Sequence, residues 1–437
     1  MKKYALFAAA ALVALAACSK NEVKPQTPET PVDDDSPVAV QFGVASASTS
    51  IDTRSVGPVD DNWNGKQTLY VYSFARAATP LDYMTAKPFI NNIGAASPST
   101  GKSGVINVLN PDPKGDGSAD QTPEPFYYNN DLIYDFYGYH MDDAWATGDT
   151  PDDYTIANPL QPQAPEPETD RIYVRFLING SQDLMIAKAD PSVDFDKATD
   201  DEFKGDPNNV QYVYSAYAAR RGVQPTLTFE HLLARFNFSV VSGGADADNV
   251  MVESVAIESR YKGNLVVVAN TTGTDPDIVD PRGLAELSEN TTKLFLQQYN
   301  EDKSKLEAFK AFQVPKYVSD GANTAQAIGN GASILAVPGV ASYWLTVKLK
   351  YNEAASATNT TPIDDIRMEL KAEDLKKGEE SANATVFEAG KEYNVTIKVI
   401  GPKEVEITAD LNPWEDGGSV TIDPDDKPEL PSAGQGN

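Results

Sequence analysis

Short stretches in which apolar and polar residues alternate dominate the chain from residue 38 onward. They are rich in Val, Ile, Tyr, Phe and Thr, and clusters of Gly, Pro, Asp and Asn separate them. Alternation with a period of two is typical of antiparallel strands that bury one face. Strands are therefore predicted at 38–45, 67–74, 132–139, 172–178, 210–217, 226–241, 251–257, 265–269, 333–337, 343–351, 393–400, 405–411 and 419–422.

Helical patterns are few and short, and the two predicted helices lie at 303–312 and 374–377. No internal repeat with a period of roughly 20–50 residues is visible, which argues against propellers and solenoids. The pattern predicts an all-β protein built from antiparallel β-sandwiches with long connections.

The length of 437 residues predicts two domains, or three. The best boundary lies at Pro225, just after the basic turn at 220–222. It leaves an N-terminal β-sandwich domain at 38–225 and a C-terminal one at 226–423, with a flexible tail at 424–437.

The first residues have the organisation of an export signal. Lys2 and Lys3 precede an apolar run at 4–15, and small residues lead to Cys18 in the sequence LAAC. This is the form of a lipobox, so residues 1–17 are predicted to be a signal peptide and Cys18 the lipid acceptor. The alternatives are an ordinary cleaved signal with an incidental cysteine, or a membrane span, for which the run falls short of about 20 residues.

Residues 18–37 have the composition of a disordered tether, with prolines, charges and few apolar side chains. Fully extended, this segment could reach roughly 60 Å. Cys18 is the only cysteine, so lipidation leaves no thiol for a disulfide, a nucleophile or a metal site.

The formal net charge of −28 moves to −30 when residues 1–17 are removed. Such a surface should repel nucleic acid and anionic membranes, so no nucleic-acid partner is expected.

Candidate chemistry is sparse. His140 follows a tyrosine-rich strand and is expected at a strand end or on the surface, whereas His231 is expected in a core or interface. No local motif suggests a catalytic triad, so the chain is not expected to be an enzyme and no catalytic residue is assigned. The loops at 112–120 and 274–280 are rich in aspartate but lack calcium-loop spacing, and the GNG at 329–331 lacks a third glycine. No metal or cofactor is expected.

The chain has 20 tyrosines and four tryptophans, Trp63, Trp145, Trp344 and Trp414. Aromatic residues line carbohydrate sites and also fill β-sandwich cores. Because most of them lie within predicted strands, core filling is favoured.

Several stretches together resemble the fimbrillin family, the subunits and accessory proteins of type V pili in Bacteroidales-type bacteria. Their order and spacing cover nearly the whole mature chain. They are YDFYGY at 134–139, DLMIA at 183–187, LTFEHLLAR at 227–235, SILAVP at 333–338, and AGKEYNVTIKV at 389–399, the last followed by a short strand and Trp414.

This resemblance implies two transthyretin-like β-sandwich domains in tandem, exported as a lipoprotein and assembled at the outer surface. For stalk subunits it implies that an arginine-specific, trypsin-like protease removes the lipidated N-terminal strand. The C-terminal strand of another subunit then enters the groove by β-augmentation.

The sequence contains suitable parts for such processing. Residues 38–45 form a candidate first strand, and a cut between Arg54 and Ser55 would release it together with the anchor. An ordinary loop arginine is the alternative, and Lys66 and Arg76 are weaker candidates. The candidate donor strands are 405–411 and 418–422, although prolines at 424, 428 and 431 oppose a long inserted strand.

The leading hypothesis is a non-enzymatic fimbrial subunit or tip component at the outer membrane surface or in the fimbrium. Its expected partners are other fimbrial subunits, the processing protease, the outer membrane through the lipid on Cys18, and a host or bacterial surface ligand. An anchor role would keep the lipid. The rival hypothesis is a surface glycan-binding lipoprotein.

Overall fold

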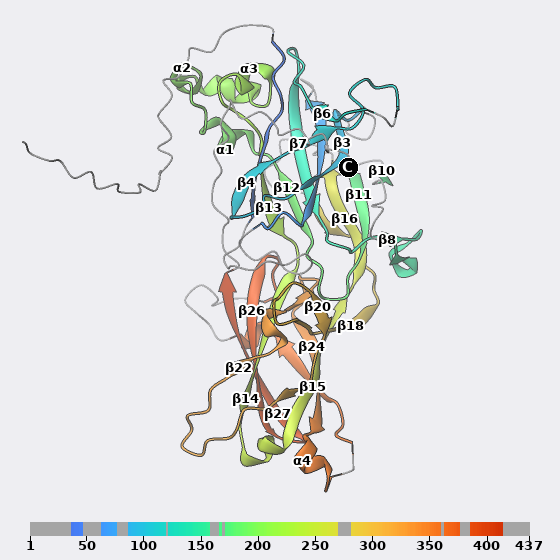
Figure 1. Cartoon of the computed structure of the whole chain (residues 1–437), viewed down its shortest axis with the longest axis vertical. Coiled ribbons are helices and arrows are strands. Elements are labelled where there is room, and N and C mark those ends of the chain that lie inside the picture. The colour runs from blue at the N-terminus through green and yellow to red at the C-terminus, as the bar shows by residue number, and fades with distance from the viewer. Residues whose placement is uncertain are drawn as a thin grey trace, which may run out of the picture.

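The computed structural model confirms an all-β protein and describes residues 36–46, 63–76, 86–118, 121–157, 166–167, 171–269, 281–359, 362–375 and 385–413. The molecule is elongated, and strands occupy both halves along its long axis (Figure 1). Most strands from the first half of the sequence lie in the upper half, whereas the last strands lie in the lower half. None of the helices in the described ranges is long and apolar enough to cross a bilayer.

A seven-stranded sheet forms the main layer of the upper half. Its order is β3-β2-β7-β12-β13-β1-β4, and every neighbouring pair is antiparallel except β1 and β13, which are parallel. The strands are β1 Phe42–Ser46, β2 Thr68–Arg76, β3 Ile90–Ala96, β4 Ser103–Ile106, β7 Ile133–His140, β12 Met185–Lys188 and β13 Thr226–His231.

A four-stranded sheet packs against part of this layer. It consists of β10 Glu166–Pro167, β11 Arg171–Leu177, β16 Lys262–Ala269 and β17 Gly283–Ala285. Two short ribbons pair β5 Leu109–Asn110 with β6 Glu124–Pro125, and β8 Ala146–Thr147 with β9 Thr155–Ile156. Short helices lie at η1 Pro151–Asp153, α1 Pro191–Phe195, α2 Asp201–Gly205, η2 Pro207–Tyr212 and α3 Ala216–Ala219.

The lower half is a sandwich of two five-stranded sheets. One contains β14 Ala234–Ser242, β22 Gln326–Ala327, β23 Ile334–Ala336, β26 Lys391–Gly401 and β27 Glu404–Pro413. The other contains β15 Val250–Arg260, β18 Thr291–Phe295, β21 Phe312–Gln313, β24 Ser342–Tyr351 and β25 Ile366–Lys371. The lower half also contains a two-stranded ribbon of β19 Gln297–Tyr299 and β20 Leu306–Ala308. Its short helices are η3 Ala245–Asn249, η4 Gly329–Gly331, α4 Glu353–Ser356 and η5 Ala372–Asp374.

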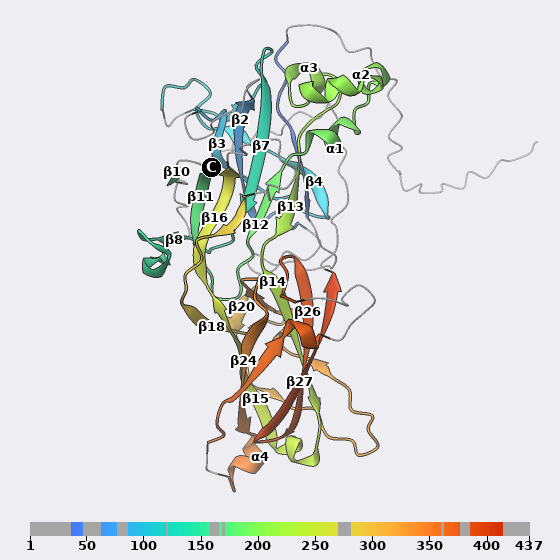
Figure 2. The same ribbon diagram turned by 180° about the vertical axis from the view of Figure 1, so that it is seen from behind.

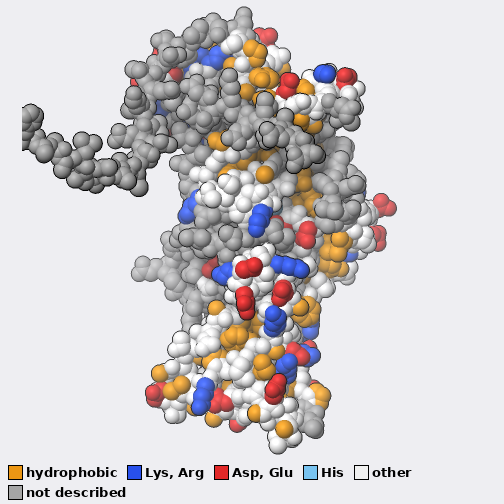
Figure 3. Space-filling model, in the orientation of Figure 1, with side chains coloured by type: hydrophobic (Ala, Val, Ile, Leu, Met, Phe, Trp, Pro, Cys, Tyr) orange, Lys and Arg blue, Asp and Glu red, His pale blue; other side chains and the backbone are white. Residues whose placement is uncertain are grey.

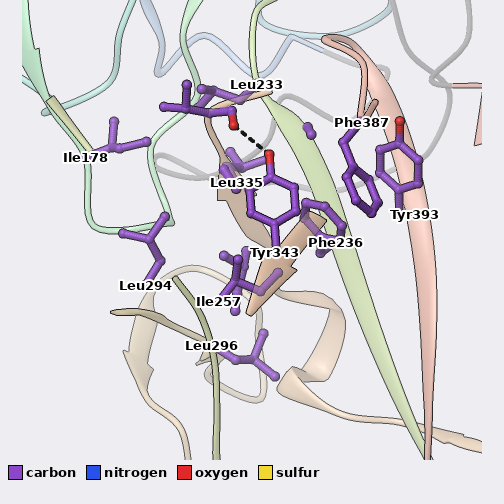
Figure 4. Packing of buried hydrophobic residues seen from close by; sticks show 14 of the residues in the cluster. Ile178, Leu233, Phe236, Ile257, Leu294, Leu296, Leu335, Tyr343, Phe387 and Tyr393 are labelled. Carbon is purple, nitrogen blue, oxygen red and sulfur yellow. Dashed lines mark hydrogen bonds between the residues drawn. The ribbon is translucent and has the colours of Figure 1, made fainter. Parts of the chain in front are cut away.

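One hydrophobic core runs through the joint between the halves. Strict alternation along β26 turns Tyr393, Val395, Ile397 and Val399 inward, where Tyr393 stacks on Phe236 of β14 with ring centroids 5.2 Å apart. Figure 4 shows Ile178, which follows β11 of the upper half, to the left of Leu233 and Leu335 and of the aromatic residues of the lower half, and all of them belong to one buried cluster. The two halves therefore share buried apolar surface.

The chain crosses this joint more than once. Leu232 and Leu233 link β13 of the upper half to β14 of the lower half, and Tyr261 links β15 below to β16 above, as both ribbon views show (Figure 2). The predicted boundary at Pro225 does not coincide with the limits of the sheets, because β13 and β16 follow it yet pair with strands that precede it.

Three local predictions are wrong. The segment predicted as one strand at 226–241 forms two strands in different sheets, β13 and β14. The segment predicted as a strand at 210–217 holds the end of η2 and the start of α3, because Asp206 and Ser215 cap the first turns of these helices through their side chains. The segment predicted as a helix at 303–312 contains β20 and the start of β21, because a turn at Lys303, with φ of 56°, folds β20 back onto β19. In the predicted helix at 374–377, Asp374 ends η5, and residues 376–377 lie outside the described ranges, as do 419–422.

Candidate functional site

β1, the first strand in the described part of the chain, occupies an interior position of the seven-stranded sheet. β1 pairs in parallel with β13, where Val44 lies opposite Leu227, and antiparallel with β4, where Phe42 lies opposite Ile106. The Gly43 N–H donates to the Pro225 carbonyl at 3.0 Å. Removing β1 would therefore leave two unpaired strand edges, one on each side of the vacated position.

The side chains of β1 are as buried as those of any core strand. Phe42 and Val44 are fully buried, Phe42 packs edge-to-face on Phe136 with centroids 5.2 Å apart, and Val40 just before the strand is 2% exposed. Ala45, on the other face, is also fully buried. Burial of each large apolar side chain contributes about 1.5–3 kcal/mol, so an unfilled groove would be costly and would accept a strand with matching apolar residues.

The chain re-enters the core at Trp63. This side chain is fully buried, its N–H group in the backbone donates to the Gly101 carbonyl at 2.9 Å, and its ring meets Phe229 edge-to-face at 5.6 Å. The predicted cleavage residues Arg54 and Ser55 lie between β1 and Trp63, outside the described residues, as does Cys18. A cut after Arg54 would leave β1 attached to the rest of the fold by non-covalent contacts alone.

The two weaker cleavage candidates differ in their surroundings. Arg76 is the last residue of β2 and lies opposite Ile133, and its guanidinium donates to Asp135 at 2.7 and 2.9 Å. A paired strand with a bound guanidinium is a poor protease substrate. Lys66 is exposed in the turn before β2 and is the better of the two.

One of the predicted donor segments is a strand within its own sheet. Residues 405–411 belong to β27, which pairs with β26 over its whole length and has β26 as its only sheet neighbour among the described strands. Val405, Ile407 and Ala409 alternate with exposed residues. The second candidate, 418–422, lies outside the described residues.

Both histidines lie in the interior. His231 ends β13 with its Nδ1 2.9 Å from Asp183 Oδ2, so the expectation of a core position is confirmed. His140 ends β7 as predicted but is only 2% exposed, so its ring is not at the surface. Its Nε2 lies 2.9 Å from Asp142 Oδ1 and its Nδ1 2.9 Å from the Thr68 carbonyl.

Aromatic residues mostly fill the core, as expected for Trp63 and Trp145, which are 0% and 2% exposed. Trp344 of β24 and Phe295 of β18 are exceptions, at 39% and 51% exposed. The guanidinium carbon of Arg367 lies 3.9 Å from the centroid of the Trp344 ring. A cation therefore already occupies one face of this ring. Trp414 lies outside the described residues.

The described part of the aspartate-rich loop, residues 112–118, closes on itself. The Asp112 carboxylate accepts hydrogen bonds from the backbone N–H groups of Gly117 at 3.0 Å and Asp116 at 3.2 Å, and these bonds, the one from Gly117 foremost, hold the pKa of Asp112 below its usual value. Among the described residues, no group of three or more His, Cys, Asp or Glu is placed to hold a metal ion.

The fold and the buried first strand define a two-lobed β-sandwich protein that completes its upper sheet with its own N-terminal strand. No family model matches the sequence, and no curated protein does. Solved structures similar to this chain include a proposed cell adhesion protein from Bacteroides uniformis, at 14% identity and a TM-score of 0.41, with 87% of this chain and 98% of that one covered.

A fimbrilin from Porphyromonas gingivalis is similar at 10% identity and a TM-score of 0.36, over 87% of this chain and 99% of that one. The fimbrial anchor protein Mfa2 from the same organism is similar at 13% identity and a TM-score of 0.27, with 87% and 99% covered. At such identities and TM-scores, the likeness concerns the arrangement of strands and does not extend to a shared activity.

Two features of the site have no simple signal in the sequence. The parallel pairing of β1 with β13 joins segments far apart in the chain, and only their apolar alternation marks them as strands. The pairing of His231 with Asp183 likewise depends on strand register. His140 and Asp142, by contrast, are two residues apart, and their nearness could have been anticipated.

Proposed function

We propose that this chain is a structural fimbrial subunit or tip component, exported as a lipoprotein and assembled by protease-triggered strand exchange. The observation that carries the proposal is β1, a strand buried on both faces and paired on both sides, with the predicted cleavage residue Arg54 after it in the chain. A strand so placed completes the sheet of the precursor, and its loss after the cut would open a groove between β13 and β4.

The proposed assembly proceeds in steps. Lipid on Cys18 holds the precursor at the outer membrane through the tether at 18–37. A trypsin-like protease cuts after Arg54, and β1 leaves with the anchor. An incoming strand from another subunit then pairs with the edges of β13 and β4, and its alternate apolar side chains take the places of Phe42 and Val44.

Limited digestion of the purified precursor with an arginine-specific protease tests the proposal. The product is expected to begin at Ser55 and to form ladders that resist SDS, because inserted strands are held by a full set of backbone hydrogen bonds. Arg54→Gln should abolish both results. Arg76→Gln is the matched control and should change neither, because Arg76 lies in a paired strand. An N-terminus still at acylated Cys18 in assembled fibres would refute processing.

A surface glycan-binding protein is the alternative, and the observation in its favour is the pair of exposed aromatic residues Trp344 and Phe295 on one sheet. Arg367 over the Trp344 ring weighs against a free stacking platform. Monomers that stay monomeric after digestion and bind polysaccharide would favour this alternative. Loss of that binding in Trp344→Ala would locate it.

A further inference from the structure

The two histidines of the chain and two buried aspartates form one group at the joint between the halves, called here the histidine–aspartate cluster: His140, Asp142, Asp183 and His231. His140 and His231 end β7 and β13, and Met185 of the intervening strand β12 lies opposite both of them. The four side chains are 0–3% exposed. The lower ends of three adjacent strands therefore meet in this cluster.

The geometry around His140 requires an extra proton. Its Nδ1 faces the Thr68 carbonyl and its Nε2 faces the Asp142 carboxylate, both at 2.9 Å, and both partners are acceptors. A neutral imidazole has a single N–H and can satisfy only one acceptor. A second proton, on the ring or on the carboxyl group, is needed to join His140 to Asp142.

The surrounding charges favour retention of that proton. Burial alone would lower the pKa of His140, but the charge and hydrogen bond of Asp142, the Thr68 carbonyl and the charge of Asp183 raise it above its usual value. Burial raises the pKa of Asp142, against the effects of His140 and of the Asp183 N–H. From the loops packed around the cluster, Asp143 faces the amide of Gln182 at 2.9 Å. Loss of the proton would leave carboxylates buried in a low-dielectric site.

The cluster is connected to the lower half through the loop at 178–184. The Asp183 N–H donates to Asp142 Oδ2 at 2.8 Å. The backbone of Asp142 is in the left-handed region, with φ of 43°. In the same loop, the Gly180 carbonyl accepts from Leu335 N–H of the lower half at 2.7 Å. The Leu232 N–H, where the chain crosses the joint, donates to the Leu184 carbonyl at 2.9 Å.

We propose that the histidine–aspartate cluster is a proton-dependent clasp that fastens the joint between the two halves. With its protons retained, the cluster binds the ends of β7, β12 and β13 to the loop at 178–184. With the extra proton lost, the carboxylates repel one another and the loop separates from β23 and from the crossing at Leu232. This device acts independently of the proposed fimbrial function.

The sign of the effect follows from the histidine. A folded-state pKa raised above the unfolded value of about 6.5 gives stabilisation that is fully present below that value and is lost as pH rises through the folded pKa. The raised pKa of Asp142 acts in the same direction. The joint is therefore expected to be more stably closed at pH 6 than at pH 9. The equilibrium constant for opening of the joint should rise about tenfold for each unit of the pKa shift.

Proton NMR of the full precursor tests the clasp directly, because a chain with two histidines gives two ring signals to titrate. The His140 signal is expected to titrate above pH 6.5. Hydrogen exchange, corrected for its intrinsic pH dependence, should show protection at 178–184 and 231–233 falling from pH 6 to pH 9, by about tenfold for each unit by which the pKa of His140 exceeds 6.5. Residues 345–349 of β24 are the internal control and should stay constant. A His140 signal at or below pH 6.5, or unchanged protection of the joint, overturns the proposal.

A variant gives a second readout. Asp142→Asn removes the buried charge and offers an amide donor to His140, so the protection of the joint should become independent of pH between 6 and 9. Asp131→Asn, at an exposed position before β7, is the matched control and should keep the wild-type pH dependence. If Asp142→Asn keeps it as well, the cluster is not the clasp.

Discussion

Replacing Phe42 with alanine is expected to lower the free energy of unfolding of the uncut protein by about 3–5 kcal/mol. The side chain is fully buried at the start of β1 and packs on Phe136, so its removal leaves a cavity between the sheet and the core beneath it. Urea titration followed by circular dichroism measures the loss. The upper half should unfold first, because Phe42 belongs to the hydrophobic cluster confined to that half.

Val105→Ala provides the matched control. Val105 lies in the neighbouring strand β4 opposite Gly43 but is 38% exposed. A substitution at such a position should change the stability by no more than about 0.5 kcal/mol. Equal losses for Phe42→Ala and Val105→Ala would mean that β1 does not contribute to the core, and the proposed groove would lose its basis.

A disulfide between β1 and β4 is expected to stop polymerisation completely without stopping cleavage. Ala45 lies opposite Ser103 in the antiparallel register, and the Cα atoms of directly opposed residues fall within about 4.4–6.8 Å, the range a disulfide spans. In a chain that begins after Cys18, the double variant Ala45→Cys/Ser103→Cys should be cut after Arg54 like the wild type. The covalent link then keeps β1 in the groove, and SDS-resistant ladders should be absent.

The reduced protein supplies the internal control for this experiment. Addition of dithiothreitol to the cut, clamped protein should restore the ladders, and each single cysteine variant should form them without reduction. If the oxidised double variant assembles as readily as the wild type, the incoming strand does not replace β1, and assembly uses a different surface.

The sequence predicted the strands well where apolar and polar residues alternate strictly. β24 and β26 show it clearly, with apolar residues inward at every second position. The segment at 210–217 was wrongly predicted as a strand because its valines and tyrosines favour strands, whereas the caps supplied by Asp206 and Ser215 decide the local structure. The composition of 303–312 favours a helix, but the turn at Lys303 and the pairing of β20 with β19 determine its structure.

The candidate site was predictable only in part. The apolar alternation of 38–45 indicated a strand, but its position between β13 and β4 depends on long-range pairing that no local pattern encodes. The histidine–aspartate cluster arises because the ends of β7, β12 and β13 align in the sheet. Such alignment is a property of register, and a shift of one residue would send His231 to the opposite face.

The parallel pairing of β1 with β13 also sets an order of events during synthesis of the chain. Gln41 and its partner Gln224 are separated by 183 residues. In a chain that emerges with its N-terminus first, β1 therefore remains unpaired with β13 until almost half of the chain has emerged. Closing so long a loop makes this contact late and slow to form. The strand that emerges first is thus among the last to be seated, and the nascent protein must reach residue 231 with an apolar segment still unburied.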